Sequence, residues 1–226
     1  TLITSSAASD VYKRQCTTCI MTFKPEPIYY DGRVAFPRTD FIYSEKIDES
    51  VTDGIIDFYH TQEIFEKWAG ETIADDGTGL VNTDIKDSLD NPVFVGITDE
   101  RVRNFTEEVN RVMNNYVEIF PLCSKTSGWK MEEFFNLQYY KPGGGYHLWH
   151  CERQSSSRSN TYRHMVWMTY LNDVPDGGTE WFHQELYIPA QKGLTVIWPA
   201  DWTYHHKGRK SDTSDKLIAT GWYHFV

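Results

Sequence analysis

The chain has 226 residues, a formal net charge of −10 at pH 7 and 15% aromatic residues, a length that lets one domain bury a sizeable core. The acidic balance argues against nucleic acid and against a membrane surface as the main partner, since both are bound by clustered Lys and Arg. No apolar run approaches the roughly 20 residues that a bilayer span needs.

The first 25 residues contain no apolar segment long enough for a secretory signal. Residues 1–15 are predicted to be a non-native leader. Cys16 and Cys19 form a single CxxC, and a zinc ribbon would need a second such pair, so a structural or incidental role is favoured for them. The two other cysteines are Cys123 and Cys151. Few cysteines and no signal predict a reducing compartment, and therefore a cytoplasmic location.

The part of the chain from about 40 to 125 shows helical periodicity. Apolar residues at steps of three and four predict one or two amphipathic helices over 50–70, with Asp48 and Ser50 as candidate caps. A longer helix is predicted at about 98–120, with Asp99 and Glu100 in its first turn. These helices are interpreted as the support of a second, sheet-rich part.

After Trp129 the apolar period changes to two, which is typical of strands. The predicted strand segments are FFNLQYY, GYHLWHCE, YRHMVWMTYLND, TEWFHQ, ELYIPA, GLTVIWPA and KLIATGWYHF. The sequence PDGG at 175–178 is a turn signal, and RQSSSRSN at 153–160 is predicted to be a mobile loop. Many short strands at this spacing predict a sandwich or a barrel-like double sheet.

One predicted strand carries a possible pair of metal ligands. In a strand, residues two apart face the same side, so His150 and Glu152 would project together while Cys151 points away. Two histidines and one carboxylate can hold Fe(II) and leave open positions on the metal. The third ligand would be His205 or His206, of which only one can point inward. A His-x-Glu pair on its own also arises by chance.

The last predicted strand strengthens this interpretation. Lys216 lies ten residues after His206 and shares strand parity with Thr220 and Trp222. A cation on the inward face of a strand is costly unless it meets an anion, and a dicarboxylate ligand would provide one. The alternative is a solvated lysine at the mouth of the strand.

Together these residues resemble the Fe(II)- and 2-oxoglutarate-dependent dioxygenases, within them the prolyl 4-hydroxylase-like branch. The pattern is His-x-Asp/Glu, a distal His, a basic residue about ten positions later and a Trp near the end of that strand. The matching positions are His150, Glu152, His206, Lys216 and Trp222. The spacing to Lys216 and the following Lys-Gly favour His206 over His205. The resemblance covers about 130–226 well.

The resemblance implies roles for further residues and for the fold. Tyr140, Tyr170, Thr220 and Trp222 match positions of the 2-oxoglutarate pocket, and Arg163 matches an arginine near the substrate groove. Glu replaces the commoner Asp among the iron ligands. The implied fold is mainly β with N-terminal helices: a single domain over 16–226, with helical support at about 40–125 and a double-stranded β-helix, or jelly-roll, core at about 130–226.

The implied activity is hydroxylation of a substrate C–H bond with release of succinate and CO2. It would use Fe(II), O2 and 2-oxoglutarate, and it allows ascorbate in addition. Peptidyl proline is the predicted target; a free amino acid or another small molecule is the alternative. A metal-binding jelly roll without catalysis, or a structural jelly roll, are alternatives from other classes. Binding of a peptide is predicted to close the 153–160 loop and to reduce proteolysis near Ser155 to Ser157.

Overall fold

The computed structural model describes residues 29–30, 33–35, 40–73, 78–154 and 158–226. The predicted leader at 1–15, the Cys16–Cys19 pair and the proteolysis site at Ser155 to Ser157 lie outside the described residues. None of the helices within the described ranges is both long and apolar enough to cross a bilayer.

Two long helices form where the periodicity predicts them, α2 (Glu49–Thr61) and α3 (Glu100–Ile119). Each starts at an aspartate: Asp48 accepts a hydrogen bond from the Ser50 amide, and Asp99 accepts one from the Arg101 amide. The helix expected over 50–70 ends earlier than predicted. The side chain of Gln62 accepts hydrogen bonds from the amides of residues 64 and 65 and turns the chain away, and Trp68–Ala69 is a strand, β4.

The larger sheet is antiparallel and has the order β1-β2-β3-β15-β12-β17-β10-β8-β4, with β9 beside β17. Its strands are β1 (Tyr29–Tyr30), β2 (Arg33–Ala35), β3 (Tyr43–Lys46), β4 (Trp68–Ala69), β8 (Leu89–Phe94), β9 (Trp129–Met131), β10 (Phe134–Tyr140), β12 (Arg163–Tyr170), β15 (Leu194–Pro199) and β17 (Lys216–Phe225). The predicted segments FFNLQYY and KLIATGWYHF coincide with β10 and β17.

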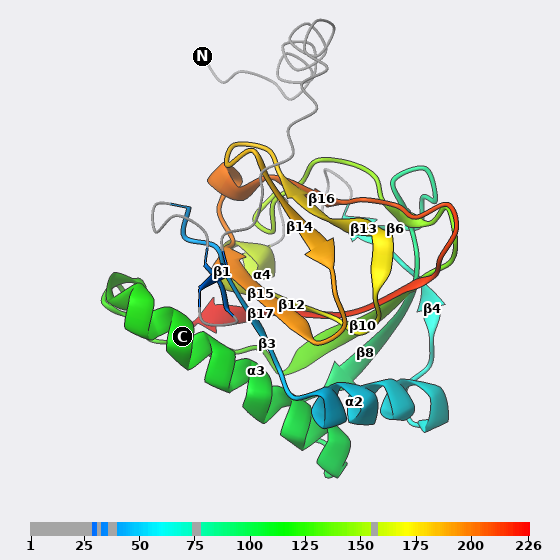
Figure 1. Ribbon diagram of the computed structural model, residues 1–226, viewed down its shortest axis with the longest axis horizontal. Helices are drawn as coiled ribbons and strands as arrows, with labels where there is room; N and C mark the ends of the chain where they lie inside the picture. The colour runs from blue at the N-terminus through cyan, green and yellow to red at the C-terminus, as the bar shows by residue number, and fades with distance from the viewer. Residues whose placement is uncertain (1–28, 31–32, 36–39, 74–77, 155–157) are drawn as a thin grey trace, which may run out of the picture.

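The smaller sheet has the order β14-β13-β16 and faces the larger one (Figure 1). Its strands are β13 (Val174–Trp181), β14 (Leu186–Ala190) and β16 (His206–Gly208). Two small ladders join β5 (Thr72–Ile73) to β6 (Gly79–Leu80), and β7 (Lys86–Asp87) to β11 (Gly145–Tyr146). The short helical elements are η1 (Pro121–Ser124), α4 (Arg158–Thr161) and η2 (Trp202–Tyr204). The predicted fold is confirmed: a mainly β chain with N-terminal helices and a double-stranded β-helix core.

Two predicted local features differ from the structure. The PDGG sequence lies within β13 rather than in a turn between strands; the register shifts between Val174 and Thr179, and Gly178 has φ +114°. Glycine allows this bulge because a side chain is rarely accommodated at such a φ. The segment GYHLWHCE is a strand only at Gly145–Tyr146, followed by an isolated bridge at His150.

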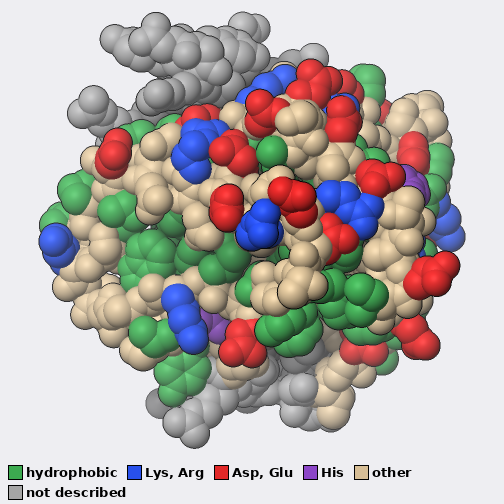
Figure 2. Space-filling model, turned by 90° about the horizontal axis from the view of Figure 1, so that it is seen from below, with side chains coloured by type: hydrophobic (Ala, Val, Ile, Leu, Met, Phe, Trp, Pro, Cys, Tyr) green, Lys and Arg blue, Asp and Glu red, His purple; other side chains and the backbone are tan. Residues whose placement is uncertain are grey.

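Strand alternation divides the core between the two faces of the larger sheet. In β12, Met165 and Trp167 pack against the layer of α2 and α3, whereas Val166, Met168 and Tyr170 pack toward the smaller sheet. The helices cover the lower face of the sheet in Figure 1. Seen from below, acidic and basic side chains are interspersed with apolar ones over the molecule (Figure 2), and α3 carries ion pairs such as Arg111–Glu108. The predicted supporting role of the helices follows from this packing.

A pair of glycine substitutions tests the packing between sheet and helices. A Cβ at Gly221 in β17 would lie 2.6 Å from the Trp167 ring, whereas one at Gly54 in α2 meets only the Arg101 side chain, at 3.7 Å. We expect Gly221→Ala to lower the free energy of unfolding by about 1–3 kcal/mol. Gly54→Ala should raise it by roughly 0.5–1 kcal/mol, because alanine favours the helix. Urea unfolding measures both; equal effects of the two changes would contradict the tight Gly221–Trp167 contact.

Candidate functional site

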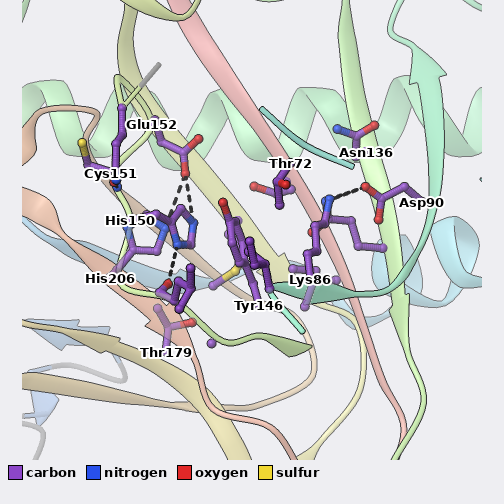
Figure 3. Close-up of a pocket in the computed structure, with 18 of the residues that line it drawn as sticks. Thr72, Lys86, Asp90, Asn136, Tyr146, His150, Cys151, Glu152, Thr179 and His206 are labelled. Carbon is purple, nitrogen blue, oxygen red and sulfur yellow. Dashed lines mark hydrogen bonds and ion pairs between the residues drawn. The ribbon is translucent and has the colours of Figure 1, made fainter. Parts of the chain in front are cut away.

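His150, Glu152 and His206 come together at one point between the two sheets. Their potential ligand atoms all lie within 4.8 Å of one another. Glu152 Oε1 lies 3.4 Å from His206 Nε2 and 4.0 Å from His150 Nε2, and the three side chains converge in Figure 3. The predicted group of two histidines and one carboxylate is therefore assembled in space.

The backbone holds the two histidines opposite each other. The amide of His150 donates to the carbonyl of His206 at 3.0 Å, and the amide of His206 donates back at 2.8 Å. His206 begins β16, which pairs with β13 through Trp181. Glu152 lies in a turn after this bridge and not in a strand, so the turn rather than strand alternation brings it beside His150. Cys151 points away from the three, as Figure 3 shows.

Backbone carbonyls set the ring orientation of both histidines. The Nδ1 of His150 lies 3.0 Å from the Leu148 oxygen, and that of His206 lies 3.0 Å from the Tyr204 oxygen. A carbonyl only accepts, so Nδ1 carries the hydrogen and Nε2 keeps its lone pair for the site. Burial, followed by the neighbouring His206, lowers the pKa of His150 to about 3, which keeps its ring neutral. Neutral imidazoles with a carboxylate form a donor set that suits Fe(II).

Glu152 is held by two donors on the side away from the histidines. Its Oε2 accepts from Trp222 Nε1 at 2.8 Å and from Arg163 Nη1 at 3.2 Å. The Arg163 guanidinium lies 3.6 Å from the centre of the Trp222 ring. Burial raises the pKa of Glu152, but the neighbouring His206 and the charge of Arg163 outweigh it, so the pKa falls below its usual range. The carboxylate is therefore ionised and its orientation is set.

All the site residues predicted from the sequence line one cavity of about 500 Å³. They are Tyr140, His150, Glu152, Arg163, Tyr170, His206, Lys216, Thr220 and Trp222. Trp222, predicted for the co-substrate pocket, and Arg163, predicted for the substrate groove, both contact Glu152. The inward parity of Lys216, Thr220 and Trp222 on β17 is the one that the sequence predicts.

Lys216 is buried, with 5% of its surface exposed, so it is not a solvated lysine at the mouth of the strand. Its Nζ donates to the backbone oxygen of Arg209 at 2.7 Å and lies 5.1 Å from the centre of the Tyr140 ring. Burial lowers its pKa to about 8, opposed by the charge of Asp176. No carboxylate of the described ranges lies within ion-pair distance of Lys216. A buried cation in this situation suits an anionic ligand.

The alternative histidine, His205, lies outside the cluster. Its Nδ1 contacts the Trp202 carbonyl, and its ring lies 6.2 Å from that of His183, so it belongs to a different group of aromatic side chains. The cluster instead contains His206, the histidine that the spacing to Lys216 favours.

Sequence reasoning missed several residues of this cavity. Tyr146 stacks on the ring of His150 with 3.7 Å between ring centres. Lys86 and Asp90 form a buried ion pair in the cavity wall, next to Gln138. Gln138 could have been found, because it shares strand parity with Tyr140. Lys86 could not, because a two-residue strand has no periodicity.

Comparison with protein families points to the same class of protein as the sequence motif. Residues 135–224 match the family model of the 2OG-Fe(II) oxygenase superfamily. None of the curated proteins matches the sequence. The family match confirms the resemblance inferred from the motif and supports an enzyme over a non-catalytic or structural jelly roll.

Solved structures of low sequence identity share the fold. A viral collagen prolyl hydroxylase from Paramecium Bursaria Chlorella virus-1, in complex with 2OG, matches with a TM-score of 0.59 and 14% identity over 82% of this chain and 97% of its own. A prolyl-4-hydroxylase of Pseudomonas putida matches with a TM-score of 0.58 and 12% identity, over 83% of this chain and 94% of its own. A prolyl hydroxylase of Trichoplax adhaerens, in complex with a hypoxia inducible factor peptide fragment, matches with a TM-score of 0.57 and 13% identity. The match covers 83% of this chain and 84% of its own.

Substitution of the neighbouring histidines tests the metal site. His206→Ala should weaken binding of Co(II), used as a spectroscopic probe, beyond the roughly 10–100-fold cost of losing a residue that only orients a ligand. His205→Ala is the matched control and should leave Co(II) affinity nearly unchanged. Titration followed by visible absorbance measures both. Loss of binding in the His205 variant, with binding retained in the His206 variant, would mean that the register is wrong by one residue.

Proposed function

We propose that this chain, an Fe(II)- and 2-oxoglutarate-dependent dioxygenase, hydroxylates a C–H bond of peptidyl proline and releases succinate and CO2. The observation that carries the proposal is a single cavity that contains the cluster His150, Glu152 and His206 together with the buried cation Lys216. A metal site alone would not need a buried lysine without a carboxylate partner. A site that binds both a metal and a dicarboxylate co-substrate would need such a lysine, because its charge pairs with the far carboxylate.

His150, Glu152 and His206 are the proposed iron ligands. When bound, the iron and 2-oxoglutarate supply the oxidation, in which O2 is consumed and the co-substrate is decarboxylated to succinate. The chain keeps the His150 imidazole neutral and Glu152 ionised. Trp222 and Arg163 hold Glu152 by its Oε2, which leaves Oε1 directed at the histidine nitrogens. We therefore assign Trp222 and Arg163 to the orientation of this ligand as well as to the cavity wall.

Lys216 is the proposed partner of the far carboxylate of 2-oxoglutarate. A charge-assisted hydrogen bond in a buried site is stronger than one between neutral groups. Tyr170 and Thr220 have partners within the protein, the Thr179 hydroxyl at 2.7 Å and the Trp167 carbonyl at 3.2 Å. Their role is to shape a polar wall, while Lys216 provides the charge. Tyr140 lies beside Lys216 and completes the proposed co-substrate pocket.

Peptidyl proline is proposed as the target from two kinds of support. The similar structures are prolyl hydroxylases, one of which has a peptide bound. The cavity residue Leu148 is half exposed, and the neighbouring Trp149 forms an edge-to-face contact with exposed Phe182, 5.3 Å between centres. An extended segment that contains proline packs well on such aromatic surfaces. Trp181 of β13 is buried in the core and takes no part in this surface.

We further propose that the helical part and the jelly roll are one domain. Residues of α2 and α3, such as Phe58 and Phe105, share a single apolar cluster with Phe135 of β10 and Trp167 of β12. Strands β3 and β8, which precede or lie between the predicted helices, belong to the larger sheet. The use of ascorbate and a cytoplasmic location stay predictions.

Removal of the buried cation tests the co-substrate site. Lys216→Ala should raise the KM for 2-oxoglutarate steeply, because the buried carboxylate loses a partner worth about 1.5–3 kcal/mol. Lys216→Arg should lose less, since the charge stays and only its geometry changes. Succinate release at varied 2-oxoglutarate measures both, with exposed Lys130→Ala as the control. An unchanged KM in the Lys216→Ala enzyme would remove Lys216 from the site.

The substrate is tested with matched peptides. A peptide that contains proline should stimulate succinate formation and gain the mass of one oxygen atom, whereas the same peptide with alanine in place of proline should do neither. Mass spectrometry and succinate assays give the two readouts. Stimulation by a free amino acid alone, with every peptide unmodified, would move the assignment to a small-molecule hydroxylase.

A further inference from the structure

A second buried ion pair lies in the wall of the cavity, away from the proposed iron ligands. Lys86 of β7 and Asp90 of β8 are 7% and 5% exposed, and their side chains contact each other directly (Figure 3). Both residues precede the segment 135–224 that matches the oxygenase family. The pair is thus a contribution of the N-terminal part of the chain to the site.

The surroundings of the pair are closely packed and hydrogen-bonded. Ser88 Oγ donates to Asp90 Oδ1 at 2.7 Å, and Lys86 Nζ lies 3.4 Å from the Glu71 carbonyl. A Cβ at Gly70 would come within 2.1 Å of Ser88 Oγ and 2.9 Å of Lys86 Cε, so a larger residue does not fit there. Buried ion pairs are weak evidence for stability, because apolar residues of similar volume often replace them without loss.

A chain of hydrogen bonds leads from this pair to the proposed co-substrate pocket. Gln138 Nε2 donates to Asp90 Oδ2 at 3.3 Å, and the Tyr140 hydroxyl donates to Gln138 Oε1 at 2.8 Å. Gln138 lies opposite Asp90 in the register of β10 and β8, on the same strand face as Tyr140. Each link therefore joins neighbouring positions of the sheet.

The donor and acceptor groups of these residues fix the direction of each hydrogen bond in the series from Asp90 to Tyr140. An ionised carboxylate only accepts hydrogen bonds, so Asp90 requires Gln138 to present its NH2 group. The amide oxygen of Gln138 then faces Tyr140, and the Tyr140 hydroxyl has to donate to it. The Lys86 ammonium contacts Asp90 Oδ2 directly and balances the charge of the carboxylate. The ion pair thereby determines where the hydroxyl hydrogen of Tyr140 points, with the ring beside Lys216.

We infer that Lys86, Asp90 and Gln138 are positioning residues: they anchor the Tyr140 hydroxyl and so hold the Tyr140 ring in place as a wall of the 2-oxoglutarate pocket next to Lys216. The inference rests on the proposed co-substrate site and extends it to Lys86 and Asp90, which lie outside the family segment. It makes the affinity for 2-oxoglutarate depend on β7 and β8, which contain none of the proposed ligands of the iron or of the co-substrate.

A double-mutant cycle tests the link between Gln138 and Tyr140. Anaerobic titration of the Fe(II)-loaded enzyme with 2-oxoglutarate, followed by the visible absorption of the chelate, gives the Kd. Gln138→Leu and Tyr140→Phe should each raise this Kd about threefold to tenfold, the value of one hydrogen bond. In the Tyr140→Phe background, Gln138→Leu should add nothing, because it acts only through Tyr140. Additive effects of the two changes would overturn the inference.

The ion pair is tested as a unit, since removal of one partner would leave an uncompensated buried charge. The variant Lys86→Met with Asp90→Leu should raise the KM for 2-oxoglutarate by the same factor as Gln138→Leu, with kcat at saturating 2-oxoglutarate and thermal stability nearly unchanged. Lys192→Met, which removes the cation of the exposed Lys192–Asp53 pair, is the control and should leave the KM unchanged.

The outcomes separate the two proposals. A wild-type enzyme that binds 2-oxoglutarate, with an unchanged KM in the Lys86→Met and Asp90→Leu variant, overturns only the positioning role. A fall in kcat or stability without a change in KM also overturns it, because that result indicates a structural role. A wild-type enzyme that forms no chelate with 2-oxoglutarate overturns both this inference and the proposed function.

Discussion

The backbone bridge between His150 and His206 is the contact on which the rest of the site depends. Its two hydrogen bonds join a loop that follows β11 to the first residue of β16. With the backbones paired, both imidazoles lie on one side, and carbonyls within two residues orient each ring. Glu152 reaches the same point because the chain turns directly after the bridge. Loss of the bridge would separate all three proposed iron ligands.

The charged side chains of the cavity differ in how their charges are compensated by other protein groups. Glu152 and Lys86 are bound by protein groups on several sides, so each has a fixed orientation and a compensated charge. Among the residues that the structure describes, Lys216 donates only to the carbonyl of Arg209, and burial lowers its pKa. A protein that buries a cation in this way loses stability unless an anion binds. For this reason we assign Glu152 and Lys86, whose charges are compensated, to the fixed geometry of the site, and Lys216 to the binding of an anionic ligand.

The larger sheet serves as core and as site at the same time because its strands alternate. On β17, Leu217, Ala219 and Tyr223 pack with the helices, whereas Lys216 and Trp222 face the cavity. The helices therefore stabilise the sheet from one face and leave the other face available for chemistry. The polar chain from Lys86 to Tyr140 runs across that second face, from β8 to β10, so the N-terminal part contributes to both faces.

The sequence by itself determined those features that depend on local periodicity and spacing. Period two predicts β10 and β17 and the inward parity of Lys216, and the ten-residue spacing to Lys216 favours His206 over His205. Tertiary structure decided the rest. The contacts of Glu152 with Trp222 and Arg163 join separate segments of the chain. The Lys86–Asp90 pair is local in sequence, but it reaches the cavity wall because β8 pairs with β10. Even PDGG, a local turn signal, lies within β13, because the residues on either side of it, Val174 and Thr179, both pair with β14.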